Sequence, residues 1–250
     1  MAVRSALKQR IAAGEVALGI SCTSGNVHAA EMCAHSELDY VYLDQQHGMT
    51  PLDTLVNQLR ALAGSPVTPL VRVLRNDPGL IGQALDAGAQ GVIVPMVNTV
   101  EEARNAAQAC RYPPDGVRSW GPLRARFGLG TDPALVNPEV FCFVMVENRA
   151  GLKNVHDIVH VPGVDGIYVG PADLAVSMGL KPRLALQEGE HADAVAQIVA
   201  ACRGAGRVAA ISGNPREMGD LGFGMVSVGS DTAFIQAGLD RVAAHRRELT

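Results

Sequence analysis

Eight short apolar segments, each followed by a stretch with a helical pattern, constrain the fold of this chain most strongly. The segments are rich in Val and Ile and do not alternate with polar residues, which is typical of parallel strands buried on both faces. They occupy residues 16–21, 40–44, 69–73, 91–95, 141–147, 166–170, 207–212 and 224–229. Eight strand–helix units in 250 residues predict a (β/α)8 TIM barrel of the α/β class. A doubly wound sheet is the alternative, but no Gly-x-Gly-x-x-Gly fingerprint follows a strand.

The expected helices often begin with a capping side chain that stands directly before a proline. These pairs are Thr50-Pro51, Asp77-Pro78, Asp132-Pro133 and Asn214-Pro215. Thr50 with Asp53, and Asn214 with Glu217, also have about the spacing of a capping box. No linker interrupts this series, so residues 1–250 are expected to form a single domain.

Residues 111–133 do not fit the alternation of strands and helices. This long segment is rich in Pro and Gly, and it contains four arginines and Trp120, the only tryptophan. A loop of this length inside a compact domain is usually functional. We therefore expect a lid or a contact surface here, and a flexible excursion without a function is the alternative.

The composition of the chain limits the class of protein to which it can belong. The formal net charge of −4 gives no basic surface for nucleic acid or membrane. No apolar run approaches the roughly 18 residues of a membrane helix, and residues 1–14 have the pattern of an amphipathic helix rather than of a signal peptide. Five scattered cysteines without Cys-x-x-Cys spacing indicate reduced thiols, so we expect a cytoplasmic protein.

Two carboxylates, Glu147 and Asp173, follow neighbouring predicted strands. The active-site groups of a TIM barrel cluster at the carboxyl ends of its strands, so both side chains are expected at the same mouth. Carboxylates in that position repel unless they are protonated or bridged by a cation. A hard divalent ion such as Mg²⁺ or Mn²⁺ takes oxygen ligands of this kind. We therefore predict a metal site, while a helix-capping role is the alternative for each residue alone.

Arg72 and the segment Asp44 to His47 are the other polar groups expected at this mouth. A guanidinium within an apolar strand needs an anion, which is either a structural carboxylate or an anionic substrate. Asp44 stands three residues before His47, and an acid can hold an imidazole in one tautomer. His47 is therefore a candidate acid–base group, and an exposed loop histidine is the alternative. Ser212 ends the seventh apolar segment at the same mouth.

The positions of the lysines disfavour covalent catalysis through a lysine Schiff base. Of the 21 basic residues only Lys8, Lys153 and Lys181 are lysines, and none of them ends a predicted strand. A Schiff-base aldolase or decarboxylase needs a lysine amine at the barrel mouth. A cation can instead stabilise an enolate, which agrees with the predicted metal site.

Several stretches resemble the metal-dependent, class II pyruvate aldolases of the HpcH/HpaI type, typified by 4-hydroxy-2-oxoheptanedioate aldolase and 2-dehydro-3-deoxyglucarate aldolase. They are "LDQQHG", "PLVRVLRNDPGLIGQALDAGAQGVIVPMVNTVEEA", "RYPPDGVRSWGP", "VENRAGLKN" and "VDGIYVGPADLAVSMG". Together they extend over nearly the whole chain, and "GPADL" after a strand is among the most specific. The chain departs from the usual family pattern at Gln46 and Met145, where a glutamate and a glutamine are common.

The resemblance implies reversible cleavage of a 4-hydroxy-2-oxo acid to pyruvate, or a close 2-oxo acid, and an aldehyde. It implies that Glu147 and Asp173 bind the divalent metal, with Mg²⁺ or Mn²⁺ expected first, then Co²⁺ or Zn²⁺, and no organic cofactor. Arg72 would contact the ketone oxygen, and Asp44 and His47 would act on the aldol hydroxyl. The substrate would also contact Ser212 and a turn formed by Gly170, Pro171, Ala172 and Asp173. Backbone amides of this turn would bind the substrate carboxylate.

The resemblance also implies an assembly, in which the last helix swaps onto a partner and three swapped dimers form a hexamer. The other partners would be a small 2-oxo acid and an aldehyde, and neither nucleic acid nor membrane is expected. A citrate-lyase-β-like lyase acting on an acyl-CoA is one alternative function. A non-catalytic barrel is the other, and the presence of Arg72, Glu147 and Asp173 disfavours it.

Overall fold

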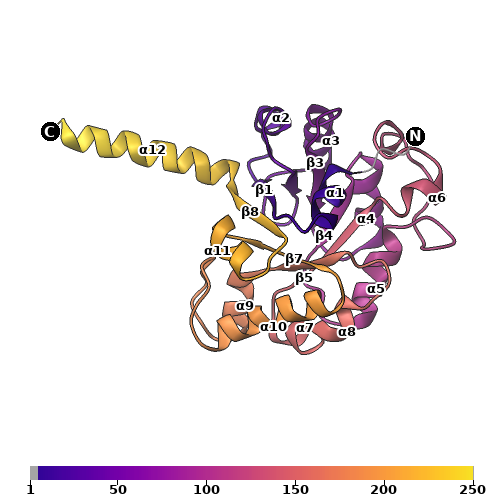
Figure 1. Ribbon diagram of the computed structural model, residues 1–250. Coiled ribbons are helices and arrows are strands. Elements are labelled where there is room, and N and C mark those ends of the chain that lie inside the picture. Colours follow the sequence, from indigo (N-terminus) through magenta and orange to yellow (C-terminus); the bar gives the residue numbers. More distant parts are fainter. Residues whose placement is uncertain (1–4, 250) are drawn as a thin grey trace.

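Eight parallel strands close into a barrel in the computed structural model, which describes residues 5–249 (Figure 1). The strands are β1 (Ala17–Cys22), β2 (Tyr40–Asp44), β3 (Thr68–Arg72), β4 (Gly91–Val94), β5 (Phe141–Val146), β6 (Gly166–Val169), β7 (Val208–Ser212) and β8 (Met225–Ser230). Each strand pairs with the next in sequence, and β8 pairs with β1. The predicted TIM-type barrel is therefore confirmed, and each strand begins and ends within about one residue of its apolar segment.

The helices alternate with the strands, and most of them cover the outside of the barrel (Figure 1). They are α1 (Ala6–Ala12), α2 (Val27–Ala34), α3 (Leu52–Ala61), α4 (Pro78–Asp86), α5 (Val100–Ala109), η1 (Ala125–Phe127), α6 (Pro133–Val136), α7 (Arg149–Lys153), α8 (Val155–Val159), α9 (Pro171–Ser177), α10 (Glu190–Gly204), α11 (Pro215–Asp220) and α12 (Asp231–Glu248). None of the helices in the described part of the chain is both long and apolar enough to cross a membrane.

Two apolar cores result from the alternation of side chains along each strand. In β2, Tyr40 and Tyr42 point into the barrel, while Val41 and Leu43 belong to the core between strands and helices. Leu7 on α1 joins the interior core and closes it from one end. The purely apolar strands follow from this arrangement, because both of their faces are buried.

Three of the four predicted helix caps are present in the structure. The side chains of Asp77, Asp132 and Asn214 each accept backbone N–H bonds at the start of a helix with proline at its first position. The prediction for Thr50 was wrong, because α3 begins at Leu52 after Pro51, and its cap has no side-chain hydrogen bond. The capping box observed on α5 joins Thr99 and Glu102 and was not predicted.

The segment 111–133 is anchored at its base and apolar at its tip. Arg118 donates to Asp86 at 2.6 Å and lies over the ring of Tyr112, with 4.4 Å between its Cζ and the ring centroid. At the tip, Leu123 and Phe127 are almost four-fifths exposed. An anchored loop with an exposed apolar tip fits a contact surface better than a flexible excursion.

The C-terminal helix α12 projects away from the barrel (Figure 1). Its Ile235, Leu239 and Val242 are all more than half exposed and share one face, because they are four and three residues apart. The helix is tied to the barrel at its first residue. The carboxylate of Asp231 accepts hydrogen bonds from the backbone N–H and the hydroxyl of both Thr23 and Ser24.

Candidate active site

Asp44 and Arg72 lie side by side at the carboxyl ends of β2 and β3, where the strand register pairs them. Arg72 Nε donates to Oδ1 of Asp44 at 2.8 Å, and Nη2 donates to Oδ2 at 2.5 Å. The Asp44 side chain is fully buried, and that of Arg72 is 15% exposed. Burial alone would lower the pKa of Arg72, but the hydrogen bonds with Asp44, together with the electrostatic effects of Asp44, Tyr42 and Tyr168, raise the pKa. Asp44 therefore holds the Arg72 guanidinium in one fixed orientation at the mouth, since two N–H donors share one carboxylate.

The Asp44 carboxylate also shapes the loop that carries His47. Its Oδ1 accepts the backbone N–H groups of Gln46 at 3.0 Å and of His47 at 3.3 Å. Among the hydrogen bonds of residues 5–249, none joins Asp44 to the imidazole of His47, and the His47 side chain is exposed. Asp44 thus positions His47 through the backbone and Arg72 through the guanidinium, so both residues depend on one carboxylate.

Glu147 follows β5 directly and is only 3% exposed. Its Oε1 accepts the backbone N–H of Met96 at 2.6 Å, and Met96 has a φ of 56°, a conformation that L residues rarely adopt. Burial raises the pKa of Glu147, the Met96 N–H opposes this rise, Asp173 adds to it, and Arg72 lowers the pKa. The three predicted groups Glu147, Asp173 and Arg72 therefore interact electrostatically at one place.

Gly170 allows the closest packing in this part of the site. A Cβ atom at Gly170 would lie 2.6 Å from Oε2 of Glu147, 2.7 Å from its Cβ and 3.3 Å from Cε of Met145. Contacts below about 3 Å are not compatible with a real Cβ, so only glycine fits. Met145, where the family often has glutamine, thus covers this part of the site with apolar atoms.

Gly170 is also the N-cap residue of α9, with Pro171 at the first helical position and Asp173 in the first turn. The N–H groups of Ala172 and Asp173 precede the first intrahelical bond, which Leu174 N–H donates to the carbonyl of Gly170. No hydrogen bond of the described residues uses either group. Two free donors and an exposed carboxylate therefore stand beside Glu147.

Ser212 ends β7 and belongs to a chain of hydroxyl groups that the sequence did not indicate. Its Oγ lies 3.0 Å from the hydroxyl of Tyr168, which donates to Ser227 Oγ at 2.9 Å. Tyr40 contacts the same Ser227 hydroxyl at 2.9 Å. Burial raises the pKa values of both tyrosines, so they remain neutral donors. Above this chain, a pocket of about 710 Å³ is lined by Ser212, Ser227 and apolar residues that include Leu186.

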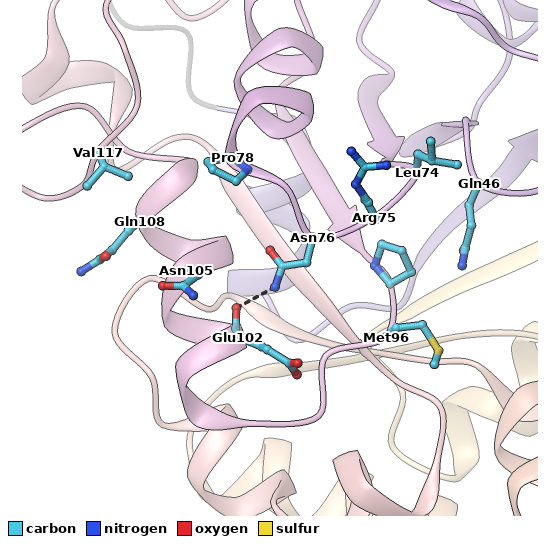
Figure 2. A pocket seen from close by; sticks show the side chains of 11 residues that line it. Gln46, Leu74, Arg75, Asn76, Pro78, Met96, Glu102, Asn105, Gln108 and Val117 are labelled. Atoms are coloured by element: carbon cyan, nitrogen blue, oxygen red, sulfur yellow. Dashed lines mark hydrogen bonds between the residues drawn. The ribbon is translucent and has the colours of Figure 1, made fainter.

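A second pocket, of about 360 Å³, is lined mainly by residues of the segments that follow β3 and β4 (Figure 2). Gln46 and Met96 lie on one side of it, and Asn105 and Gln108 lie on the other, while Arg75 projects between them (Figure 2). Oε1 of Gln46 is buried and has no hydrogen-bond partner among residues 5–249. The pocket thus borders both the loop of His47 and the residue that binds Glu147 through its N–H.

The donor groups present fit a hard divalent ion held by few protein ligands. No cluster of three or more His, Cys, Asp or Glu suited to a metal occurs among residues 5–249, which excludes there the closed set of four ligands typical of structural zinc. Glu147 Oε2, in contrast, has no hydrogen bond within the described part of the chain, and Asp173 is exposed beside it. Mg²⁺ is commonly bound by one or two carboxylates plus water and substrate oxygens, which matches this pair.

Comparison with known proteins identifies the family. The family model described as HpcH/HpaI aldolase/citrate lyase matches residues 19–237. The chain belongs to this family. A 4-hydroxy-2-oxo-heptane-1,7-dioate aldolase of Salmonella paratyphi A is 34% identical over 248 residues, covering 97% of this chain and 94% of the relative. A hydroxypyruvate/pyruvate aldolase of Deinococcus radiodurans is 37% identical over 243 residues, covering 95% and 88% respectively.

A solved structure agrees with this assignment. An HpcH/HpaI aldolase/citrate lyase family protein from Burkholderia cenocepacia superposes with a TM-score of 0.89 at 31% identity, covering 97% of this chain and 99% of that one. The resemblance stated from the sequence motifs is therefore confirmed, and this member of the family is an enzyme of the carbon–carbon lyase type. Both curated relatives described above carry the names of aldolases, which favours aldol chemistry over an acyl-CoA lyase.

Proposed function

We propose that this family member cleaves a 4-hydroxy-2-oxo acid, reversibly, to pyruvate or a close 2-oxo acid and an aldehyde. The observation that carries the proposal is the grouping of the buried Glu147 with Asp173 and Arg72 beside the free N–H groups of α9. The names of the two aldolase relatives support the substrate class. Substrates of aldolases are small molecules, so no macromolecular partner is needed for turnover.

Glu147 and Asp173 would hold a divalent ion, with Mg²⁺ or Mn²⁺ the first choice. Such an ion supplies a Lewis acid that polarises the ketone of the 2-oxo acid. The N–H groups of Ala172 and Asp173 bind and orient the carboxylate of the substrate. Arg72 donates to the ketone oxygen as negative charge develops there. Its Nη1 suits this task because, within residues 5–249, no hydrogen bond occupies it.

His47 accepts the proton of the substrate hydroxyl when the carbon–carbon bond breaks, and it returns this proton in the aldol direction. Its exposure at the mouth leaves the ring accessible to substrate, directly or through one water. Asp44 holds the guanidinium of Arg72 and, through the backbone, the start of the loop that carries His47. The proton transfer at the hydroxyl therefore uses a group that is separate from Glu147, Asp173 and Arg72.

The aldehyde part of the substrate is placed in the pocket beside Ser212, where the hydroxyl chain through Tyr168 supplies polar contacts. Arg75 lines the other pocket and serves as the matched control (Figure 2). Ser212→Ala should change the relative kcat/KM values of short hydroxylated and aliphatic aldehydes, while Arg75→Ala should leave that order unchanged. If Arg75→Ala changes that order and Ser212→Ala does not, the aldehyde part binds in the pocket of Figure 2 instead.

We also propose a hexamer built from three dimers that exchange α12, and a cytoplasmic location. The exposed apolar face of α12, with Ile235, Leu239 and Val242, supports an exchange because nothing in residues 5–249 of the same chain covers that face. The exposed tip of the 111–133 segment is a second contact surface. Five free, buried cysteines support a reducing compartment. Light scattering of the native protein and of Leu239→Glu tests the assembly.

The direct test of the function is a pyruvate-release assay with a set of 4-hydroxy-2-oxo acids. We expect turnover with Mg²⁺ or Mn²⁺, loss of turnover after thorough chelation, and recovery when the ion is restored. Full activity in metal-free protein would contradict the metal site. Cleavage of an acyl-CoA substrate without any aldolase activity would replace the proposal with a citrate-lyase-β-like function.

A further inference from the structure

His191 is a wholly buried histidine that lies outside the set of residues discussed so far. It is the second residue of α10, and both of its ring nitrogens have partners. Nδ1 lies 3.1 Å from the backbone nitrogen of Gln187, and Nε2 lies 2.9 Å from the carbonyl oxygen of Pro171. The ring therefore connects the loop before α10 with the turn that begins α9.

The two partners assign the proton of the ring. The backbone N–H of Gln187 can only donate, so Nδ1 must present its lone pair. The carbonyl of Pro171 can only accept, so Nε2 must carry the hydrogen. Each nitrogen thus has the one role that its neighbour allows, and the neutral Nε2–H tautomer is fixed.

Pro171 contributes its carbonyl to the same peptide unit that contains the N–H of Ala172. This unit is planar, and in its trans form the C=O and N–H groups point in opposite directions. A hydrogen bond that fixes the carbonyl of Pro171 therefore also fixes the direction of the Ala172 N–H. Because hydrogen bonds in a chain polarise one another, the bond from His191 also makes this N–H a stronger donor.

We propose that His191 is a positioning residue that aims and polarises the Ala172 N–H toward the carboxylate of the substrate. The inference rests on the proposed function, in which this N–H receives that carboxylate. It makes His191 responsible for affinity toward the 2-oxo acid. It leaves binding of the divalent ion by Glu147 and Asp173 largely independent of the imidazole.

Two substitutions separate the two ring nitrogens. The amide of His191→Gln can reach the position of Nε2 and still donate to Pro171. The amide of His191→Asn reaches only the position of Nδ1, so it can contact Gln187 but not Pro171. Gln58→Leu is the control for loss of a buried polar side chain elsewhere, since Gln58 is also fully buried and bonds to the Asn26 carbonyl.

The readouts are the KM for pyruvate in Mn²⁺-dependent exchange of its methyl protons with heavy water, the Kd for Mn²⁺ alone, and thermal unfolding. His191→Asn should raise the KM for pyruvate about tenfold, as expected for a weakened hydrogen bond to a charged group. Its Kd for Mn²⁺ should stay near that of the native protein. His191→Gln should recover most of the pyruvate affinity, and Gln58→Leu should leave both constants unchanged.

Equal pyruvate affinity in His191→Asn, His191→Gln and native protein would overturn the inference, and so would a parallel loss of pyruvate and Mn²⁺ binding. If the native protein itself shows no pyruvate exchange, the proposed function fails instead, which is a distinct outcome. A ring-nitrogen NMR spectrum of the native protein tests the tautomer without any variant. The inference requires a protonated Nε2 and an unprotonated Nδ1 in His191, and the opposite tautomer would refute it.

Discussion

The two halves of the candidate site differ in how firmly the barrel holds them. In the half assigned to the 2-oxo acid, Glu147 is buried, is bound by the Met96 N–H and packs against Gly170 without room for a Cβ. In the half assigned to proton transfer at the substrate hydroxyl, His47 is exposed, and its described contact with Asp44 uses only the backbone. The difference indicates that the barrel preorganises the charge-stabilising half, while the proton-handling half depends on a surface loop.

Changes in the first half should therefore affect every step of the reaction, and changes in the second half should affect cleavage alone. Arg72 belongs functionally to the first half. Its partner Asp44, however, ends β2, the strand that continues into the loop of His47 in the second half. The following substitutions test this division.

Glu147→Gln should have the largest effect, with near-complete loss of both pyruvate proton exchange and cleavage. The substitution removes the buried carboxylate, and Asp173→Asn should act similarly through the exposed one. Unfolding should not explain the loss, because burial already disfavours the charged form of Glu147, as its raised pKa indicates. Titration with Mn²⁺ and thermal unfolding of the metal-free protein measure the two effects. Retained metal binding in both variants would contradict the assignment.

Arg72→Lys should lower both rates by about 10²- to 10³-fold, the usual cost of losing one preorganised donor to developing charge. An ammonium cannot reproduce the planar fork that binds Asp44 through Nε and Nη2. Asp44→Asn should also slow both steps, because it releases the guanidinium. Steady-state assays of exchange and cleavage measure the losses. Near-native rates in Arg72→Lys would reduce Arg72 to a simple point charge.

Gly170→Ala should weaken Mn²⁺ binding and lower the free energy of unfolding by about 1–3 kcal/mol, the usual cost of overpacking. The new Cβ would lie 2.6 Å from Oε2 of Glu147, so the carboxylate has to move. Gly204→Ala in α10 is the matched control, since among residues 5–249 an added Cβ there would meet no heavy atom within 4 Å apart from its chain neighbours and its own helix backbone. Isothermal titration and denaturant unfolding check both variants. Unchanged metal affinity in Gly170→Ala would show that Glu147 has more freedom than its packing indicates.

Asp231→Asn should have the smallest effect on the chemistry, because the side-chain hydrogen bonds of Asp231 among residues 5–249 go to Thr23, Ser24 and Thr232 and to none of the residues assigned to either half. Burial opposes its charged form, but hydrogen bonds from Ser24 and Thr23 outweigh burial and lower its pKa. A lowered pKa stabilises the fold above the unfolded value of about 3.9, and this stabilisation fades as the pH falls through the folded pKa. At neutral pH the variant should lose about 1 kcal/mol, and the difference from the native protein should shrink in acid. A constant difference across that range would exclude this role of the carboxylate.

Local patterns predicted the strands and most helix starts, because these depend on residues that are near in sequence. Thr50 was misassigned because Pro51, not Thr50, occupies the cap position of α3. The partners of Arg72 and Glu147 were harder to foresee. The sequence indicated that Arg72 needs an anion, but only the register of β2 and β3 reveals Asp44 as that anion. Met96 binds Glu147 through its backbone across 51 positions, so its side chain gives no signal.

His191 is another residue whose partner is distant in sequence and therefore could not be predicted. The apolar pattern of α10 explains why His191 is buried, but it does not reveal the carbonyl of Pro171 that the ring contacts. The roles of the site residues stay predictions. The geometry makes these predictions more specific, because it assigns Arg72 and His47, which both depend on the carboxylate of Asp44, to different steps.

The division into two halves is tested most directly by the ratio of two rates in His47→Ala. Exchange of pyruvate methyl protons with heavy water, followed by NMR, reports on the half that contains Glu147 and Arg72. Pyruvate release from a 4-hydroxy-2-oxo acid reports on both halves. A general base typically contributes about 10²- to 10⁴-fold, so we expect cleavage to fall by that factor while exchange stays near the native rate. An equal fall of both rates would place His47 in the step at the 2-oxo acid and contradict the division.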